Sequence, residues 1–232
     1  MIANLLLLLT AAIWGFGFVA QVLGMNYLEP FAFIEARFIL GALSLLPVIW
    51  YLQRQQTAAG PGIGYLVYAS CVLGTILFAA SSFQQVGLLY TTASNAGFIT
   101  GMYMVFVPIF GLMLGMATGL VTWLGCIVAA IGLFMLGVND QYRMGYGDLL
   151  QLAGAGIWAL HILAIDHFTK HAPGVQLACG QFVVCAALGI LVSAGFAGET
   201  TTWPQLVAAG ATLIYAGIIT VGVAYTLQIV AQ

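Results

Sequence analysis

Two ionisable residues, Glu35 and Arg37, lie inside a long apolar stretch of this chain. An ionisable side chain within a hydrocarbon layer is costly, so it faces a protein-lined interior or extends to the membrane surface. Two positions apart on a helix, these side chains point about 200° from each other and need separate partners. The guanidinium of Arg37 suits bidentate binding of a carboxylate, whereas a desolvated Glu35 suits exchange of a proton for a cation.

Two expected helical faces combine aromatic and polar side chains. Trp14, Phe18 and Gln21 fall at helical spacing and share one face, and Trp158 and His161 share another. Rings on such faces can stack on an organic solute, while Gln21 and His161 supply polar contacts. The alternative is plain packing or an interfacial belt of aromatic side chains.

Further polar residues extend the predicted cavity. Asn95 and Tyr103 are eight positions apart and share one helical face, and Gln181 aligns with Arg37 in the repeat described below. Pro108 removes a helical hydrogen bond, so it predicts a kink near the middle of the membrane, where transporters often place their sites. We therefore include Asn95, Tyr103 and Gln181 among the candidate cavity residues.

A group of four polar residues raises the alternative of a metal site. These are His161, Asp166, His167 and His171, of which the last two histidines are four positions apart. The group lies towards an expected span end, where polar residues are ordinary, so we expect a solvated helix end and no bound metal. No glycine-rich segment carries the lysine of a phosphate-binding loop. We expect no enzymatic activity and no cofactor, with an intramembrane metal-dependent hydrolase as the alternative of another class.

The composition identifies the environment in which these residues lie. Hydrophobic residues make up 63% of the chain and charged residues 4%, and the mean hydropathy is +1.11, which excludes a water-soluble surface. A hydrocarbon core about 30 Å thick needs about 20 apolar residues per helix, and spans of this length are too long for barrel strands. We predict an all-α integral membrane protein, a polytopic helix bundle in the lipid bilayer. The eight expected spans are 4–24, 31–52, 63–84, 92–114, 119–137, 147–167, 175–196 and 204–230.

The second part of the chain repeats the first. The aligned pairs are Trp14 and Trp158, Phe38 and Phe182, Gly74 and Gly217, and Gln85 and Gln228, at offsets of 144 or 143. Five expected spans separate equivalent points, so the two copies are inverted relative to each other in the membrane. We predict two repeats, residues 1–138 with five helices and residues 145–232 with three. The second repeat is expected to be truncated, with a natural eight-span protein as the alternative.

Charge in the loops gives an expected orientation. With the amino terminus in the cytoplasm, Arg54 and Lys170 lie in cytoplasmic loops and Arg143 lies outside. The net charge of −2 and the lack of a basic run give no indication of nucleic acid as a partner. The expected partners are the lipid bilayer and a small molecule.

Three segments carry a family resemblance: AAIWGFGFV at 11–19, EARFILGAL at 35–43 and GLLYTTASNAGFITGMYMVFVPIFGLMLG at 87–115. Together they resemble the EamA-type exporters of the drug/metabolite transporter superfamily. The resemblance implies ten helices in two inverted five-helix repeats, a central substrate cavity, and export of small metabolites across the bacterial inner membrane. It also favours Arg37 as a structural or substrate-binding residue. Two departures are Met116-Ala117, where a charged pair is common in the family, and the lack of the last two helices.

These observations predict a secondary transporter that exports an amphipathic metabolite, such as an amino acid, by alternating access. We expect Trp14, Arg37, Tyr103 and Trp158 to line one central cavity, with Glu35 as a less central neighbour. The nearest alternative is a proton-coupled exporter of cationic drugs that uses Glu35. A non-transporting fragment is a further alternative.

Overall fold

The computed structural model describes residues 2–55, 61–137 and 144–231 of the chain, and its regular structure in these ranges is helical throughout. Within these ranges, seven helical spans are apolar and long enough to cross a membrane: Leu5–Gly24, Pro30–Arg54, Ile63–Gly87, Ala93–Met113, Tyr146–Thr169, Gly174–Ala197 and Gly210–Gln228. The eighth expected span, 119–137, corresponds to α6 (Leu120–Gly137), whose apolar part Leu120–Gly132 is shorter. The protein is therefore a multi-pass helical membrane protein. Residues 1, 138 and 232, which bound the predicted repeats, and Arg143 lie outside the described residues.

The chain forms two compact units. The first unit comprises Met1–Phe78 and Phe168–Gln232, and the second comprises Ala79–His167. The boundaries fall within two helices, α3 (Ile63–Gly87) and α7 (Tyr146–Thr169).

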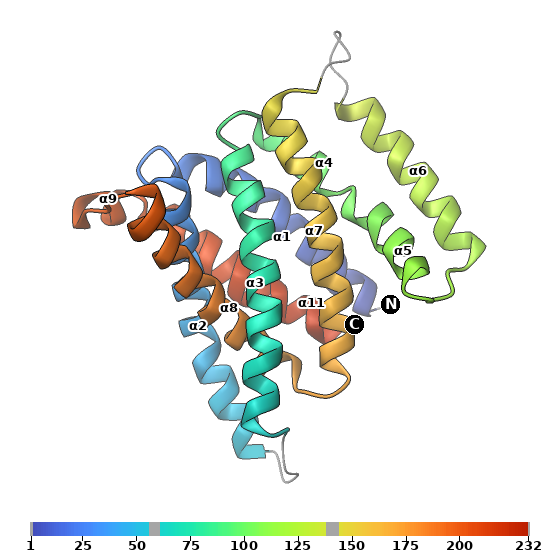
Figure 1. Cartoon of the computed structure of the whole chain (residues 1–232), viewed down its shortest axis with the longest axis horizontal. Helices are drawn as coiled ribbons and strands as arrows, with labels where there is room; N and C mark the ends of the chain where they lie inside the picture. Colours follow the sequence, from blue (N-terminus) through green and yellow to red (C-terminus); the bar gives the residue numbers. More distant parts are fainter. Residues whose placement is uncertain (1, 56–60, 138–143, 232) are drawn as a thin grey trace. The chain divides into compact units, whose positions relative to one another are not determined.

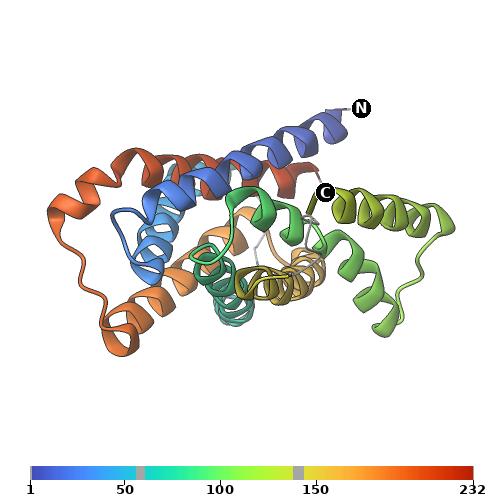
Figure 2. The same ribbon diagram turned by 90° about the horizontal axis from the view of Figure 1, so that it is seen from above.

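The first unit is built around a pair of packed helices, α2 (Pro30–Gln55) and α8 (Gly174–Val192), which lie side by side in Figure 1. The chain continues from α8 through η1 (Ser193–Ala197), α9 (Trp203–Ala208), α10 (Gly210–Ile214), η2 (Tyr215–Ala224) and α11 (Tyr225–Ala231). The helix α1 (Ile2–Gly24) packs along η2 and α11, as Figure 2 shows for the blue and red segments. The expected final span at 204–230 is therefore a series of helical segments, of which η2 has π-helical hydrogen bonding.

A carboxylate from a distant loop fixes the start of α2. Pro30 occupies the first helical position, where its missing N–H costs nothing. The carboxylate of Glu199 accepts hydrogen bonds from the backbone N–H groups of Phe31, at 3.4 Å, and Ala32, at 2.8 Å. These groups have no partner within the helix, and a negative charge is favourable at a helix amino terminus. Glu199 thus ties the segment before α9 to α2.

Two glycines allow close helix packing in the first unit. A β-carbon at Gly74 would lie 2.5 Å from Val184 Cβ and 2.8 Å from the carbonyl oxygen of Gln181. Gly217 has equivalent contacts with Arg37 and Leu40, which align with Gln181 and Val184 at an offset of 144. A β-carbon at Gly217 would lie 2.6 Å from Leu40 Cβ and 2.8 Å from the carbonyl oxygen of Arg37. Small residues at such positions let helix backbones approach closely in membranes.

The second unit contains the end of α3 and α4 (Ala93–Thr100), α5 (Tyr103–Met113), α6 and most of α7. The fourth expected span is divided between α4 and α5, with the interruption at Gly101 and Met102. Pro108 lies inside α5, so the carbonyl of Met104 lacks its helical donor. The thiol of Cys126 donates to that carbonyl, with a sulfur–oxygen distance of 3.5 Å. The described break thus precedes Pro108, and a kink at Pro108 itself stays a prediction.

The start of α7 is joined to the loop before α4. The side chain of Asp148 accepts hydrogen bonds from the hydroxyl of Thr91, at 2.5 Å, and from the N–H of Gly145, at 3.0 Å. A β-carbon at Gly147 would lie 2.7 Å from the carbonyl oxygen of Gly87, so only glycine fits there without movement of the backbone.

Candidate functional site

Arg37 is the most deeply buried charged residue of the first unit, with 4% of its surface exposed. Its Nη1 donates a 2.6 Å hydrogen bond to the side-chain oxygen of Gln21, and the Gln21 amide donates at 3.2 Å to the carbonyl of Gly17. Its Nε is buried and has no hydrogen-bond partner among the described residues. Gln21 and Arg37 come from α1 and α2, so this contact joins the first two helices.

A chain of aromatic rings leads from α1 to Arg37. Trp14 lies edge-on to Tyr225 with ring centroids 5.3 Å apart, and Tyr225 lies edge-on to Phe182 at 5.4 Å. Phe182 contacts Phe38 at 5.7 Å, and the guanidinium carbon of Arg37 lies 4.9 Å from the Phe38 ring. Edge-to-face aromatic pairs and cation–π contacts are both favourable in such surroundings. We call Trp14, Gln21, Arg37, Phe38, Phe182 and Tyr225 the arginine–aromatic cluster.

The π-helix η2 supports one end of this cluster. The indole N–H of Trp14 donates to the carbonyl of Thr220 at 3.2 Å, and the hydroxyl of Tyr215 donates to the carbonyl of Ile13 at 3.2 Å. The Thr220 hydroxyl in turn donates to the carbonyl of Tyr215 at 3.1 Å. Because a π-helix changes the partners of backbone carbonyls, such segments occur frequently at functional sites. Here η2 holds the indole of Trp14 beside Tyr225.

Three other candidate residues of the first unit lie elsewhere on its helices. The carboxylate of Glu35 accepts a hydrogen bond from the side chain of Ser193, and a β-carbon at Gly189 would lie 3.1 Å from Glu35 Cβ. Glu35 therefore faces the end of α8, and its partner differs from that of Arg37, as the helical spacing requires. Phe18 and Gln181 are buried in α1 and α8.

The second unit contains a buried hydrogen-bond network that includes Trp158. The indole N–H of Trp158 donates to the side-chain oxygen of Gln84 at 3.0 Å. The amide of Gln151 donates to the backbone carbonyl of Gln84 at 2.8 Å, and Thr100 donates to the Gln151 oxygen at 3.3 Å. The ring of His161 lies edge-on to Trp158 with centroids 5.6 Å apart. The network joins α3, α4 and α7 within this unit.

Asn95 and Tyr103 are half-buried residues of the second unit. The backbone N–H of Asn95 bonds to the hydroxyl of Thr92, at 3.1 Å, which caps α4. Within the described ranges, no three His, Cys, Asp or Glu side chains are placed to hold a metal ion together. His161, Asp166, His167 and His171 thus do not form such a group.

Two buried polar side chains on one face of α3 lack hydrogen-bond partners among the described residues. Ser81 and Gln85 are both 0% exposed, and neither the Ser81 hydroxyl nor either polar atom of the Gln85 amide has a partner there. Four positions apart, they lie on the same helical face. Unpaired buried polar groups are costly, so their retention within an apolar span marks a site that a water molecule or a polar solute group can satisfy.

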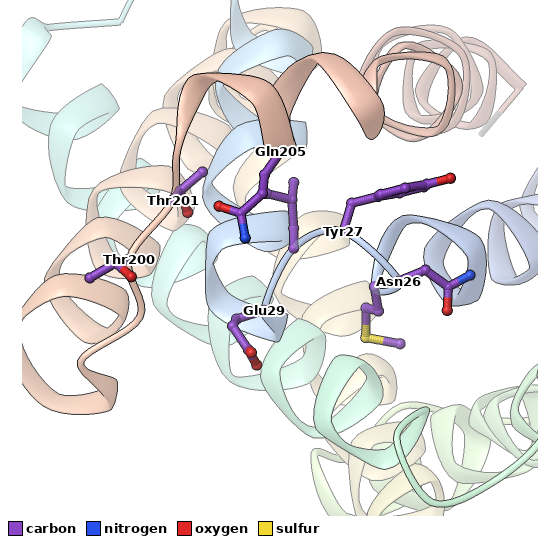
Figure 3. Close-up of a pocket in the computed structure, with 8 residues that line it drawn as sticks. Asn26, Tyr27, Glu29, Thr200, Thr201 and Gln205 are labelled. Atoms are coloured by element: carbon purple, nitrogen blue, oxygen red, sulfur yellow. The ribbon is translucent and has the colours of Figure 1, made fainter.

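A polar cavity of about 180 Å³ opens at one end of the first unit, shown in Figure 3. It lies between the α1–α2 loop and the segment before α9, and its lining residues are Met25, Asn26, Tyr27, Leu28, Glu29, Thr200, Thr201 and Gln205. None of the candidate site residues predicted from the sequence lines this cavity.

Glu199 directly precedes Thr200, one of the lining residues, in the sequence. Partial burial raises the pKa of its carboxyl above the usual range, the hydrogen bonds from Ala32 and Phe31 oppose that rise, and the charge of Glu29 adds to it.

Several residues of these sites carry little or no signal in the sequence. Tyr225, Phe38 and Phe182 read as ordinary aromatic residues of apolar spans, and only the repeat pairing of the two phenylalanines set them apart. Gln84 and Gln151 carried a clearer signal, because a carboxamide inside a membrane span normally has a hydrogen-bonding role.

Comparisons with known proteins agree with this architecture. The sequence profile of the EamA-like transporter family matches residues 1–138. Two proteins of Archaeoglobus fulgidus, each named "Uncharacterized transporter", are similar to the chain. One is 29% identical over 215 residues, which cover 86% of this chain and 61% of the relative, and the other is 30% identical over 230 residues, which cover 93% and 75%. The chain thus spans about three fifths of the length of the first relative. A solved crystal structure shares the fold, with a TM-score of 0.69 at 21% identity over 99% of this chain and 78% of the other.

Proposed function

Because the chain belongs to the EamA-like transporter family, we propose that it is a secondary transporter that moves a small amphipathic metabolite across the membrane by alternating access. The single observation that carries this proposal is the arginine–aromatic cluster of the first unit, which places a buried cation against Phe38 at one end of a chain of four aromatic rings. An ionisable residue within a span is by default a functional residue, and aromatic rings are the usual lining of a site for an organic molecule. The fold and the cluster thus favour the same class of function.

Alternating access is supported by the internal symmetry of the contacts. Gly74 packs against Gln181 and Val184, and Gly217 packs against the residues aligned with them. A two-fold relation between residues 1–88 and 147–231 would produce this reciprocity. Inverted repeats related in this way give two conformations of similar energy, open to opposite sides. We propose this relation as the basis of the transport cycle, in the direction of export and with the amino terminus in the cytoplasm.

The orientation of Glu35 weighs against a proton-coupled exporter of cationic drugs as the leading function. Its carboxylate accepts a hydrogen bond from Ser193 and its Cβ lies against Gly189. The cluster around Arg37 is thus on a different face of α2 from Glu35. A cationic solute would meet repulsion from the uncompensated guanidinium, whereas a neutral, zwitterionic or anionic solute would not.

Solute exchange in proteoliposomes tests the proposed function. The purified protein is reconstituted with a panel of amino acids, organic acids and lipophilic cations, and labelled solute counterflow is measured against protein-free liposomes. We expect exchange of at least one amphipathic carboxylate-bearing solute, reduced in W14A and retained in W203A, since Trp203 is 76% exposed and is not a member of the cluster. Exchange of lipophilic cations only, lost in E35Q, would favour the drug exporter. No exchange of any solute by the unmodified protein would overturn the proposal.

A further inference from the structure

The guanidinium of Arg37 lacks an anionic partner among the described residues. Its hydrogen-bonded neighbour is the neutral amide of Gln21, and its Nε has no partner there. The side chains that interact electrostatically with it are those of Cys185 and Tyr225, both of which are ordinarily neutral at pH 7. A buried cation without a counter-ion is destabilising even after local relaxation. An anion that binds beside Arg37 would offset this cost.

We propose that Arg37 binds the carboxylate of the transported solute, an inference that rests on the proposed function and names its substrate class. Gln21 occupies Nη1, so the other edge of the guanidinium, which carries the unpartnered Nε, remains for a ligand. The donors on that edge match the two oxygens of a carboxylate in bidentate geometry. A single lysine ammonium offers no such edge.

The chain of aromatic rings that begins at Phe38 indicates what the rest of the ligand is. Phe38 lies under the guanidinium, and Phe182, Tyr225 and Trp14 follow it at centroid separations between 5.3 and 5.7 Å. A ligand whose carboxylate reaches Arg37 therefore meets Phe38 first and can extend its body along the chain of rings that follows. The solute is accordingly a carboxylate with an apolar, preferably aromatic, body.

The same contacts close the site in this conformation. Arg37 is 4% exposed, and the Trp14 indole is held by its hydrogen bond to Thr220 and its contact with Tyr225. A solute reaches the guanidinium when α1 separates from η2 at these contacts. Opening of this kind is what alternating access requires of a site between packed helices.

Thermal unfolding of the detergent-purified protein with three matched probes tests the inference. Benzoate, benzamide and benzylamine share one ring and differ in carrying a carboxylate, a neutral amide or an ammonium. We expect benzoate to raise the melting temperature in a saturable way, and benzamide and benzylamine to leave it unchanged. An equal response to benzamide and benzoate, or a response to benzylamine alone, would overturn the inference.

Two arginine variants on the same helix make the test specific. R37K keeps the charge but loses the bidentate edge, so its affinity for benzoate should fall about tenfold to a hundredfold. R54Q removes the arginine at the exposed end of α2, where it lies over Trp50, and should bind benzoate as the unmodified protein does. An equal loss of benzoate affinity in R37K and R54Q, or no loss of benzoate affinity in R37K, would show that Arg37 does not bind the carboxylate.

A charge introduced at Gln21 provides a test that does not depend on removing Arg37. In Q21E, the new carboxylate lies within hydrogen-bonding distance of Arg37 and acts as an internal counter-ion. We expect this variant to melt at a higher temperature without ligand and to lose its response to benzoate. An unchanged benzoate response in Q21E would contradict the proposal.

Because these assays measure binding, a protein that binds benzoate through Arg37 without moving solutes would contradict only the proposed function. Transport of solutes that persists unchanged in R37K would contradict only this inference.

Discussion

The rings of Phe38 and Phe182 meet where α2 packs on α8, with centroids 5.7 Å apart and planes inclined by 40°. Both residues are buried, and they occupy aligned positions of the proposed internal repeat. A residue that contacts its own repeat partner lies near the axis that relates the two copies. Further along the same helices, Glu35 lies against Gly189 and the Cys179 thiol bonds to the carbonyl of Ala42, so α2 and α8 run antiparallel. The cluster around Arg37 is therefore built beside the proposed axis.

The reciprocal glycine contacts predict matched costs of substitution. G74V and G217V place extra carbons against neighbouring backbone carbonyls, and each should lower stability by about 1–3 kcal/mol. The control is G15A, because no atom lies within 4 Å of a β-carbon at Gly15, and this change should stabilise α1 by about 0.5–1 kcal/mol. Thermal unfolding in detergent measures all three. A large cost at one glycine and none at the other would contradict the two-fold relation.

Substitution by methionine should change the stability of the protein in opposite directions at two glutamines of the second unit. Q85M removes an amide without partners, so it should raise stability while lowering transport, if the amide serves a solute or water. Q151M breaks hydrogen bonds to Gln84 and Thr100, and should cost about 1–3 kcal/mol. The measurement is the melting temperature together with solute exchange for each variant. Destabilisation by Q85M comparable to that by Q151M would show that Gln85 has a structural partner.

Glu199 predicts a dependence of stability on pH. Its pKa in the folded protein is raised above the ordinary value of 4.5, so the protonated form is favoured by folding. Its contribution is fully present below pH 4.5 and is lost as the pH rises through the raised pKa. The difference in melting temperature between the unmodified protein and E199Q should therefore shift in favour of the unmodified protein as the pH falls from 7 to 4.5. The charges of Glu29 and Glu35 interact with Glu199, and both residues are present in the unmodified protein and in E199Q. A difference in melting temperature that does not change with pH would therefore contradict the assignment to Glu199.

The hydrogen bond between Trp14 and η2 predicts a specific loss in W14F. This variant keeps a ring beside Tyr225 but removes the donor to Thr220, which should cost about 0.5–1.5 kcal/mol of stability and reduce solute exchange. W203F changes an exposed tryptophan and serves as the control. Equal exchange rates for W14F and W203F would show that this hydrogen bond has no part in transport.

The membrane spans were predictable because apolar runs of about 20 residues fix helix existence and approximate bounds. The expected span 63–84 corresponds to α3, which ends at Gly87, and 147–167 corresponds to α7. The π-helix η2 and the break at Gly101 and Met102 were not predicted. Both depend on partners that local sequence does not reveal: η2 presents the Thr220 carbonyl to an indole 206 positions away.

The site was predictable in its residue types more than in its pairings. Arg37 and Glu35 stood out because charges are rare in membrane spans, and their separate partners followed from helical geometry. The contact of Arg37 with Gln21 depends on how α1 packs on α2. The sequence indicated both as candidate cavity residues but did not predict that they contact each other. Glu199 was missed because a carboxylate in a loop gives no sign of the helix end that it caps.

Counterflow of labelled phenylalanine in proteoliposomes, compared between R37Q and R54Q, tests the central claim most directly. Phenylalanine carries the carboxylate and the aromatic ring that the arginine–aromatic cluster is proposed to bind, and both variants remove one arginine from the same helix. The account predicts exchange by the unmodified protein and by R54Q, and none above protein-free liposomes by R37Q. Exchange by R37Q at the rate of the unmodified protein would contradict it.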